Sequence, residues 1–137
     1  MTGAYLTDLN WKEAEKLLSD TTIVVFPLGA GAKEHGLHLP LCNDQLMAEY
    51  LARELASRSD VVVAPTITYS YYPAFVEYPG SISISANTAT GLITDACLSL
   101  SRFGPRRFYV LNTGVSTCGP LEKAAELLKQ QNIVLKY

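Results

Sequence analysis

Both histidines of the 137-residue chain lie in one short segment, GAKEHGLHLPLCND, which spans residues 31–44. His35 and His38 are three residues apart, and Glu34 and Asp44 add two carboxylates. Imidazole and carboxylate groups together suit zinc, manganese and other divalent first-row metal ions. His35, Glu34 and Asp44 are therefore candidate metal ligands. The alternative is equally open: the histidines can bond to backbone groups, and Asp44 can merely cap a helix.

The segments around these residues alternate between helix and strand. Spaced apolar residues predict amphipathic helices, and compact β-branched runs predict strands that are buried on both faces. The expected helices cover residues 8–20, 43–58, 90–104 and 119–131, and the expected strands cover 21–29, 60–69, 106–114 and 132–137. The aromatic segment 70–85 between two of these elements can end in a further short strand. Asn10 and Glu13 have the spacing of a capping box at the first helix.

The apolar residues of three predicted helices mark the faces that we expect to pack on the sheet. They are Trp11, Ala14, Leu17 and Leu18 in the first helix, Leu46, Met47, Tyr50, Leu51 and Leu55 in the second, and Leu92, Ile93, Ala96, Cys97, Leu100 and Phe103 in the third. Strands that are separated by helices predict an α/β fold with a mainly parallel sheet and helices on both faces. We expect residues 1–137 to form a single domain of this class.

Ligands of such sheets bind beyond the carboxyl ends of the strands. Three loops are predicted to leave those ends, namely residues 28–44, 69–80 and 112–119. The first contains the candidate ligands. The second contains Glu77, a carboxylate that could act as a general base next to a metal-bound water. The third reads NTGVST before a helix, a turn that either holds an anion on backbone N–H groups or simply caps the helix.

The segment HGLHLPLCND, His35 to Asp44, resembles the HGxHLPLxxD motif of the creatininase (creatinine amidohydrolase) family. Farther along, YPGSISIS and FYVLNTG resemble two weaker segments of that family, in the same order. The resemblance implies a three-layer αβα sandwich and a metal-dependent amidohydrolase with zinc or manganese ions. It also implies a small-molecule substrate and a homo-oligomer, a dimer or higher. His35 and Asp44 match metal ligands, with Asp44 at the position that bridges two ions.

The chain departs from the family pattern in three respects. Lys33 stands where the family usually has a glutamate, and the acid is found next to it, at Glu34. Gly114 stands where a further histidine is expected. Family members are also longer, so we expect this chain to lack their C-terminal half. Lys33 would repel a cation unless it pairs with an anion, and it could instead stabilise negative charge that develops on a substrate. His38 and Cys118 are further candidate ligands, each with a structural alternative.

Composition excludes several classes of partner. The net charge is −2 and no basic stripe occurs, which argues against nucleic acid. No apolar run is long enough to span a bilayer. Three cysteines without a CxxC spacing favour a reducing, cytoplasmic environment.

The resulting functional hypothesis is a metal-dependent hydrolase of an amide, lactam or related C–N bond, or of an activated ester. Its metal ligands are Glu34, His35 and Asp44, and its catalytic candidates are Glu77 and Lys33. Two alternatives stay open. One is a non-catalytic scaffold that keeps the fold without metal, and the other is metal-independent activity at a subunit interface.

Overall fold

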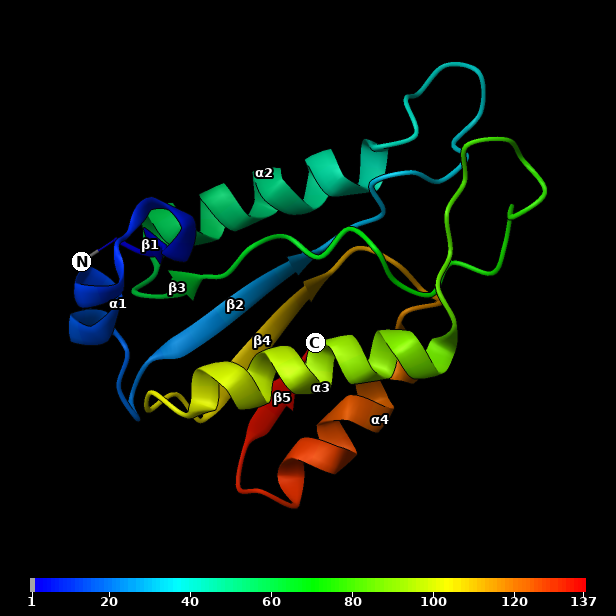
Figure 1. The fold of residues 1–137 in the computed structure, drawn as a ribbon. Coiled ribbons are helices and arrows are strands. Elements are labelled where there is room, and N and C mark those ends of the chain that lie inside the picture. The colour runs from blue at the N-terminus through cyan, green and yellow to red at the C-terminus, as the bar shows by residue number, and fades with distance from the viewer. Residues whose placement is uncertain (1) are drawn as a thin grey trace.

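The computed structural model describes residues 2–137, which form a parallel sheet with helices on both faces (Figure 1). The strands are β1 (Ala4–Tyr5), β2 (Ile23–Leu28), β3 (Val62–Val63), β4 (Arg107–Asn112) and β5 (Val134–Lys136). The helices are the 3-10 turn η1 (Leu6–Asp8), α1 (Trp11–Leu17), α2 (Asn43–Arg58), α3 (Ala86–Ser101) and α4 (Cys118–Lys129). Within these residues the strand order is β1-β3-β2-β4-β5, and every pairing is parallel. The predicted α/β class with a parallel sheet is confirmed.

Strand β2 lies at the centre of the sheet and contributes to a core on each face. Val24 and Phe26 belong to the cluster that includes residues of α3 and α4, where Phe26 stacks on Phe108 at 6.3 Å between ring centroids. Val25 points the other way and packs with Ala52 of α2. Full burial of a side chain of this size stabilises the fold by roughly 1.5–3 kcal/mol. The compact apolar run of β2 therefore reflects burial on both faces, as predicted.

Helix α2 packs on the sheet mainly through small residues, and of the predicted inward face only Leu55 lies partly buried against the core. Its buried apolar residues are Ala48, Ala52 and Ala56, which are spaced four apart. Leu46, Met47, Tyr50 and Leu51 are instead 53, 47, 55 and 40% exposed. The cause is the close approach of helix and sheet: a Cβ on Gly29 would lie 2.2 Å from the Asp44 carbonyl oxygen. Four of the five larger predicted side chains therefore point outward, whereas Leu55, near the C-terminal end of the helix, still packs against the core.

Other elements also differ from prediction in extent. Helix α1 has the predicted Asn10 capping box but none of its residues is buried, and Trp11 is 70% exposed. In α3, Ile93 and Cys97 are buried as expected, whereas Phe103, beyond its end, is 60% exposed. Of the other residues predicted on this face, Leu92 is exposed, and Ala96 and Leu100 are half-buried.

The strand predicted over residues 60–69 is reduced to Val62–Val63, followed by an isolated bridge between Leu28 and Ile67. Pro65 lies between these two pairings and has no N–H to donate to a ladder. The short strand suggested at the end of segment 70–85 is not among the strands of residues 2–137. Strand β1, with two residues, is too short to show a periodic pattern in the sequence.

The loops that follow β2, β3 and β4 meet at one edge of the sheet. The histidine loop, residues 29–42, lies beside the aromatic loop, residues 64–85, in the upper right of Figure 1. Ile82 N donates to the Ala32 carbonyl at 2.9 Å, and Glu34 N donates to Ser81 Oγ at 3.0 Å. The turn after β4 joins them, because Ser116 Oγ donates to the Tyr71 carbonyl at 2.9 Å.

Within residues 2–137, no helix combines the length and the hydrophobicity that crossing a bilayer would require.

Candidate metal centre

Asp44 is held at the sheet edge by the packing of α2 against the end of β2. It lies in the first turn of α2, where the helix dipole favours a carboxylate. Gly29 lets the backbone of this turn approach closely, and Gln45 N donates to the Ala30 carbonyl at 3.2 Å. The residue is only 6% exposed. Local sequence thus places a largely buried negative charge next to the histidine loop.

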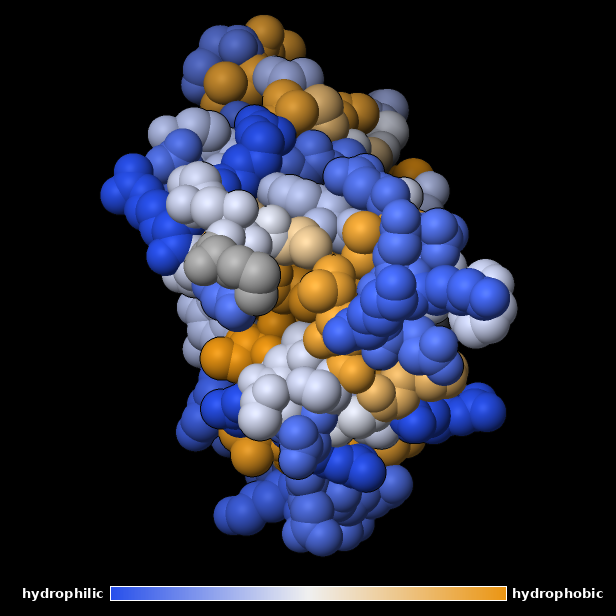
Figure 2. Space-filling view, turned by 90° about the vertical axis from the view of Figure 1, so that its left-hand side faces the viewer, coloured by the Kyte–Doolittle hydropathy of each residue, from blue (hydrophilic) through white to orange (hydrophobic). Residues whose placement is uncertain are grey.

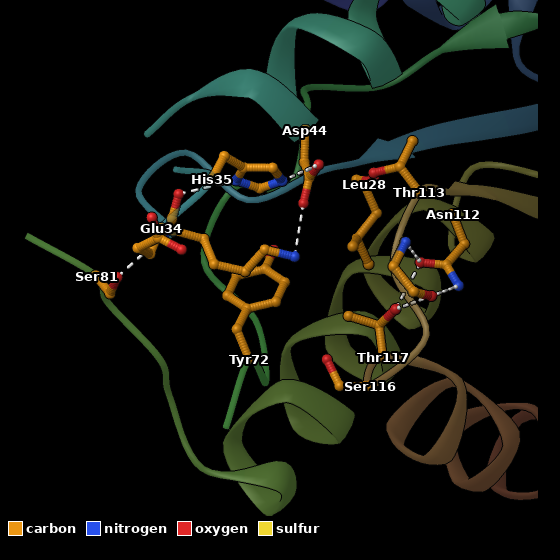
Figure 3. A network of polar contacts seen from close by, with 12 residues as sticks. Leu28, Glu34, His35, Asp44, Tyr72, Ser81, Asn112, Thr113, Ser116 and Thr117 are labelled. Atoms are coloured by element: carbon orange, nitrogen blue, oxygen red, sulfur yellow. Dashed lines mark hydrogen bonds and ion pairs between the residues drawn. The ribbon is translucent and has the colours of Figure 1, made fainter. Parts of the chain in front are cut away.

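Each carboxylate oxygen of Asp44 has a cationic or imidazole partner (Figure 3). His35 Nε2 lies 2.9 Å from Oδ1, and Lys33 Nζ lies 2.8 Å from Oδ2. His35 Nδ1 lies 2.9 Å from the Lys33 carbonyl oxygen, which can only accept. Nδ1 therefore carries a proton, and Nε2 is the nitrogen that faces Asp44. A backbone carbonyl orients many metal-binding histidines in the same way.

Tyr72 lies beneath this group in Figure 3 and closes it on one side. The Lys33 ammonium lies 5.7 Å from the centre of the Tyr72 ring, within range of a cation–π interaction. Burial, and secondarily the Asp44 charge, raise the pKa of the Tyr72 hydroxyl well above its usual range. The hydroxyl donates to the Thr68 carbonyl at 3.2 Å. Tyr72 thus supplies a neutral aromatic wall to the site.

Glu34 does not join His35 and Asp44. Its carboxylate accepts a hydrogen bond from the backbone N–H of Gly36, and Figure 3 shows it beside Ser81. In the part of the chain that the structure describes, no three His, Cys, Asp or Glu side chains are grouped as metal ligands. The residues brought together are therefore His35, Asp44 and Lys33, of which two can be ligands.

The other sequence candidates lie apart from this pair. Glu77 is exposed in the aromatic loop, and no hydrogen bond or ion pair within residues 2–137 involves its side chain. His38 and Cys118 are also exposed. These positions leave Glu77 accessible to a molecule bound at the sheet edge but do not place it on Asp44.

The sequence reasoning missed Asn112, which organises the turn after β4. Its Nδ2 donates to the Gly114 carbonyl at 2.7 Å, and its Oδ1 accepts from Thr117 Oγ1 at 2.6 Å. Oδ1 also accepts from Gly114 N at 3.2 Å, so this N–H is already bonded. Thr113 Oγ1 donates to the Leu28 carbonyl at 2.8 Å and fastens the turn to the end of β2. A polar residue at the end of a buried strand was the available signal.

The donor set fits one divalent ion in part. His35 Nε2 and the Asp44 carboxylate are the nitrogen and oxygen donors that zinc and manganese accept. Glu34 as it lies is not a third ligand, and the ammonium of Lys33 brings a positive charge to the same carboxylate.

Comparison with known proteins gives a consistent set of relatives. The family model described as creatinine amidohydrolase matches residues 7–136. The chain is 28% identical over 116 residues to creatinine amidohydrolase of Pseudomonas putida, covering 80% of this chain and 44% of that protein. It is 28% identical over 134 residues to the mycofactocin precursor peptide peptidase of Mycobacterium tuberculosis, covering 90% of this chain and 53% of the other. The chain thus spans about half the length of the curated relatives it matches.

Solved structures show the same fold. A manganese creatininase superposes with a TM-score of 0.84 at 24% identity, over 96% of this chain and 56% of that one. A mutant creatininase of Zn–Zn type gives a TM-score of 0.78, with 97 and 57% coverage. With the family model matching nearly all of the described residues, the chain belongs to the creatininase family.

Proposed function

We propose that this chain forms part of a hydrolase that cleaves an amide, lactam or related C–N bond of a small molecule with a divalent zinc or manganese ion. The observation that carries the proposal is the 2.9 Å approach of His35 Nε2 to Asp44 Oδ1 at the carboxyl ends of the strands. The relatives support it, since one is a creatinine amidohydrolase, another is a peptide peptidase, and the solved structures include manganese and zinc forms of creatininase.

His35 and Asp44 would hold the ion, and Glu34 would become a third ligand only after its carboxylate leaves the Gly36 N–H. A bound ion of this kind polarises a carbonyl and lowers the pKa of a coordinated water. The Lys33 carbonyl keeps His35 Nε2 aimed at the site. We assign Glu77, on the neighbouring loop, as the candidate base, and the Lys33 ammonium as a candidate partner for negative charge on the substrate.

Metal content and chelation test this proposal. The purified protein is loaded with zinc or manganese, desalted and analysed by mass spectrometry, and hydrolysis of an amide and lactam panel is measured before and after chelation. We expect near-stoichiometric metal that is lost in His35→Ala and Asp44→Ala. His38→Ala is the matched control, because this exposed histidine of the same loop has no hydrogen bond or ion pair with either residue of the pair within residues 2–137. Metal that persists in both ligand variants, or activity that survives chelation, would refute the assignment.

A second candidate function is a metal-free member that keeps the fold as a scaffold or regulator. The ion pair between Lys33 Nζ and Asp44 Oδ2 favours it, as does the hydrogen bond that holds the Glu34 carboxylate on the Gly36 N–H of its own loop. In that case the loaded protein retains no ion, and Asp44→Ala changes stability but no activity.

We also propose that copies of the chain associate. The outward residues of α2 are 40–55% exposed and form an apolar strip. Figure 2 shows a second apolar region, in the middle of the face that carries α1 and β1, bordered by hydrophilic residues. Exposed patches of this kind promote association, and a dimer is the simplest closed arrangement. Light scattering should give at least a dimer mass, and Tyr50→Lys should lower it.

The free thiols of Cys42, Cys97 and Cys118 agree with a cytoplasmic location, which stays a prediction.

A further inference from the structure

We infer that the Lys33 ammonium is a tethered competitor of a divalent ion for the Asp44 carboxylate, because it holds Oδ2 beside the oxygen that faces His35. The inference rests on the metal site proposed above. It concerns the lysine that is paired with the candidate ligand Asp44, so it assigns to this chain a lower metal affinity than its ligands alone would give.

The backbone of Lys33 is fixed from both sides. Its N–H donates to the Leu41 carbonyl at 2.9 Å, and its carbonyl accepts from His35 Nδ1 at 2.9 Å. The root of the side chain is thus anchored across the histidine loop. From this root the ammonium reaches Asp44 Oδ2 at 2.8 Å, which makes the encounter intramolecular. A free cation from solution has no such advantage of proximity.

The ammonium is also poorly accessible to water. The Lys33 side chain is 19% exposed and that of Asp44 is 9% exposed, and the Tyr72 ring lies on the other side of the charge. Solvent therefore screens the pair much less than a surface pair. A divalent ion on Asp44 would lie within a few ångströms of this positive charge. Binding the ion requires either like charges side by side or a swing of the ammonium into water.

The side chain and the backbone of Lys33 have opposite effects on a bound ion. The carbonyl keeps His35 Nε2 facing Asp44, which would favour a bound ion, whereas the ammonium pairs with the same carboxylate and would oppose it. A substitution of the side chain removes the competitor and leaves the carbonyl in place. Lys33→Met keeps the aliphatic length without charge, and Lys33→Gln keeps a hydrogen-bond donor without charge.

Isothermal titration with zinc chloride or manganese chloride measures the competition directly. We expect the Kd for the metal to fall at least tenfold in Lys33→Met and in Lys33→Gln relative to the wild type. Adding His35→Ala to either variant should abolish this gain in affinity. Lys12→Met is the matched control: Lys12 also lies over an aromatic ring, 5.4 Å from the centre of Trp11, but pairs with no carboxylate. Its Kd should equal that of the wild type. The rise in Tm on adding metal should increase in the same two variants.

The outcomes separate the competition from the proposed function. If the wild type binds no ion while Lys33→Met does, the competition stands and metal-dependent hydrolysis by the wild type fails. If wild type and both variants bind equally through His35 and Asp44, the hydrolase proposal stands and the competition is overturned. Failure of all three proteins to bind either metal also overturns it. Folding of each variant is checked by circular dichroism, and the two substitutions differ in shape so that one unfolded variant does not decide the test.

Discussion

The ion pair between Lys33 and Asp44 should be coupled far more strongly than an exposed pair of equal length. Two unit charges about 4 Å apart attract by about 4 kcal/mol at the effective dielectric of a protein surface. The cost of desolvating both groups offsets part of this gain. With side chains 19 and 9% exposed, we expect a net coupling energy of about 2 kcal/mol for the cycle Lys33→Met, Asp44→Asn and the double variant. Asp44→Asn alone also weakens the His35 contact and should lose about 3 kcal/mol of unfolding free energy.

Urea denaturation of the four proteins, without metal, measures this coupling. The internal control is the Glu54–Arg58 pair of α2, whose N–O distance is 2.9 Å but whose side chains are 45 and 77% exposed. Its cycle, Glu54→Gln with Arg58→Met, should give about 0.3–0.5 kcal/mol. High salt should diminish the control more than the buried pair. Equal coupling energies for the two pairs, within error, would refute the argument that burial rather than distance determines the strength.

Three further predictions test the packing of the fold. Gly29→Ala should lower the free energy of unfolding by roughly 1–3 kcal/mol and displace Asp44, because the added Cβ would lie 2.2 Å from the Asp44 carbonyl oxygen. Gly91→Ala in α3, which has open space around it, should instead raise the free energy of unfolding by up to about 1 kcal/mol. Urea denaturation measures both changes. Phe108→Ala in the core should lower the free energy of unfolding by about 3–5 kcal/mol, whereas exposed Phe103→Ala should change it by no more than about 0.5 kcal/mol. Similar decreases of Tm in the two variants would contradict the observed burial. Burial raises the pKa of the Cys97 thiol to about 12, so a thiol reagent should label exposed Cys118 in the native protein and Cys97 only after unfolding. Because the folded pKa is above the ordinary 9.0, this thiol contributes stability that is present below pH 9.0 and is lost as the pH rises through about 12, a decline that Cys97→Ala should lessen.

The sequence predicted the elements whose signals are local and strong. The Asn10 capping box and the apolar run of β2 are both where the pattern indicated, since each depends on neighbouring residues alone. The meeting of three loops at one edge followed from the general rule for parallel sheets, since the loops after β2, β3 and β4 do lie together.

The orientation of α2 could not be predicted because it depends on the distance between helix and sheet. Pattern rules give more weight to Leu and Tyr than to Ala, yet the helix approaches the sheet closely at Gly29, and its fully buried apolar residues are Ala48, Ala52 and Ala56. The sequence also could not predict that Lys33, rather than Glu34, contacts Asp44. Which of these two adjacent side chains reaches Asp44 depends on the backbone path of the histidine loop. That path is fixed by a bond to Leu41 at the other end of the loop and by a bond to Ser81 of the aromatic loop.

The pairing of β2 with β4 has a consequence for the newly made chain. This central ladder joins residues 23–28 to residues 107–112, from Ile23 opposite Arg107 to Leu28 opposite Asn112. The chain has to be made beyond residue 112 before this ladder can form, and such distant pairings fold slowly. Until then the apolar stretch IVVF of β2 lacks its permanent neighbour on the β4 side and is a site for mistaken strand pairing. The nascent chain should therefore depend on holding chaperones more than an equally stable helical bundle would.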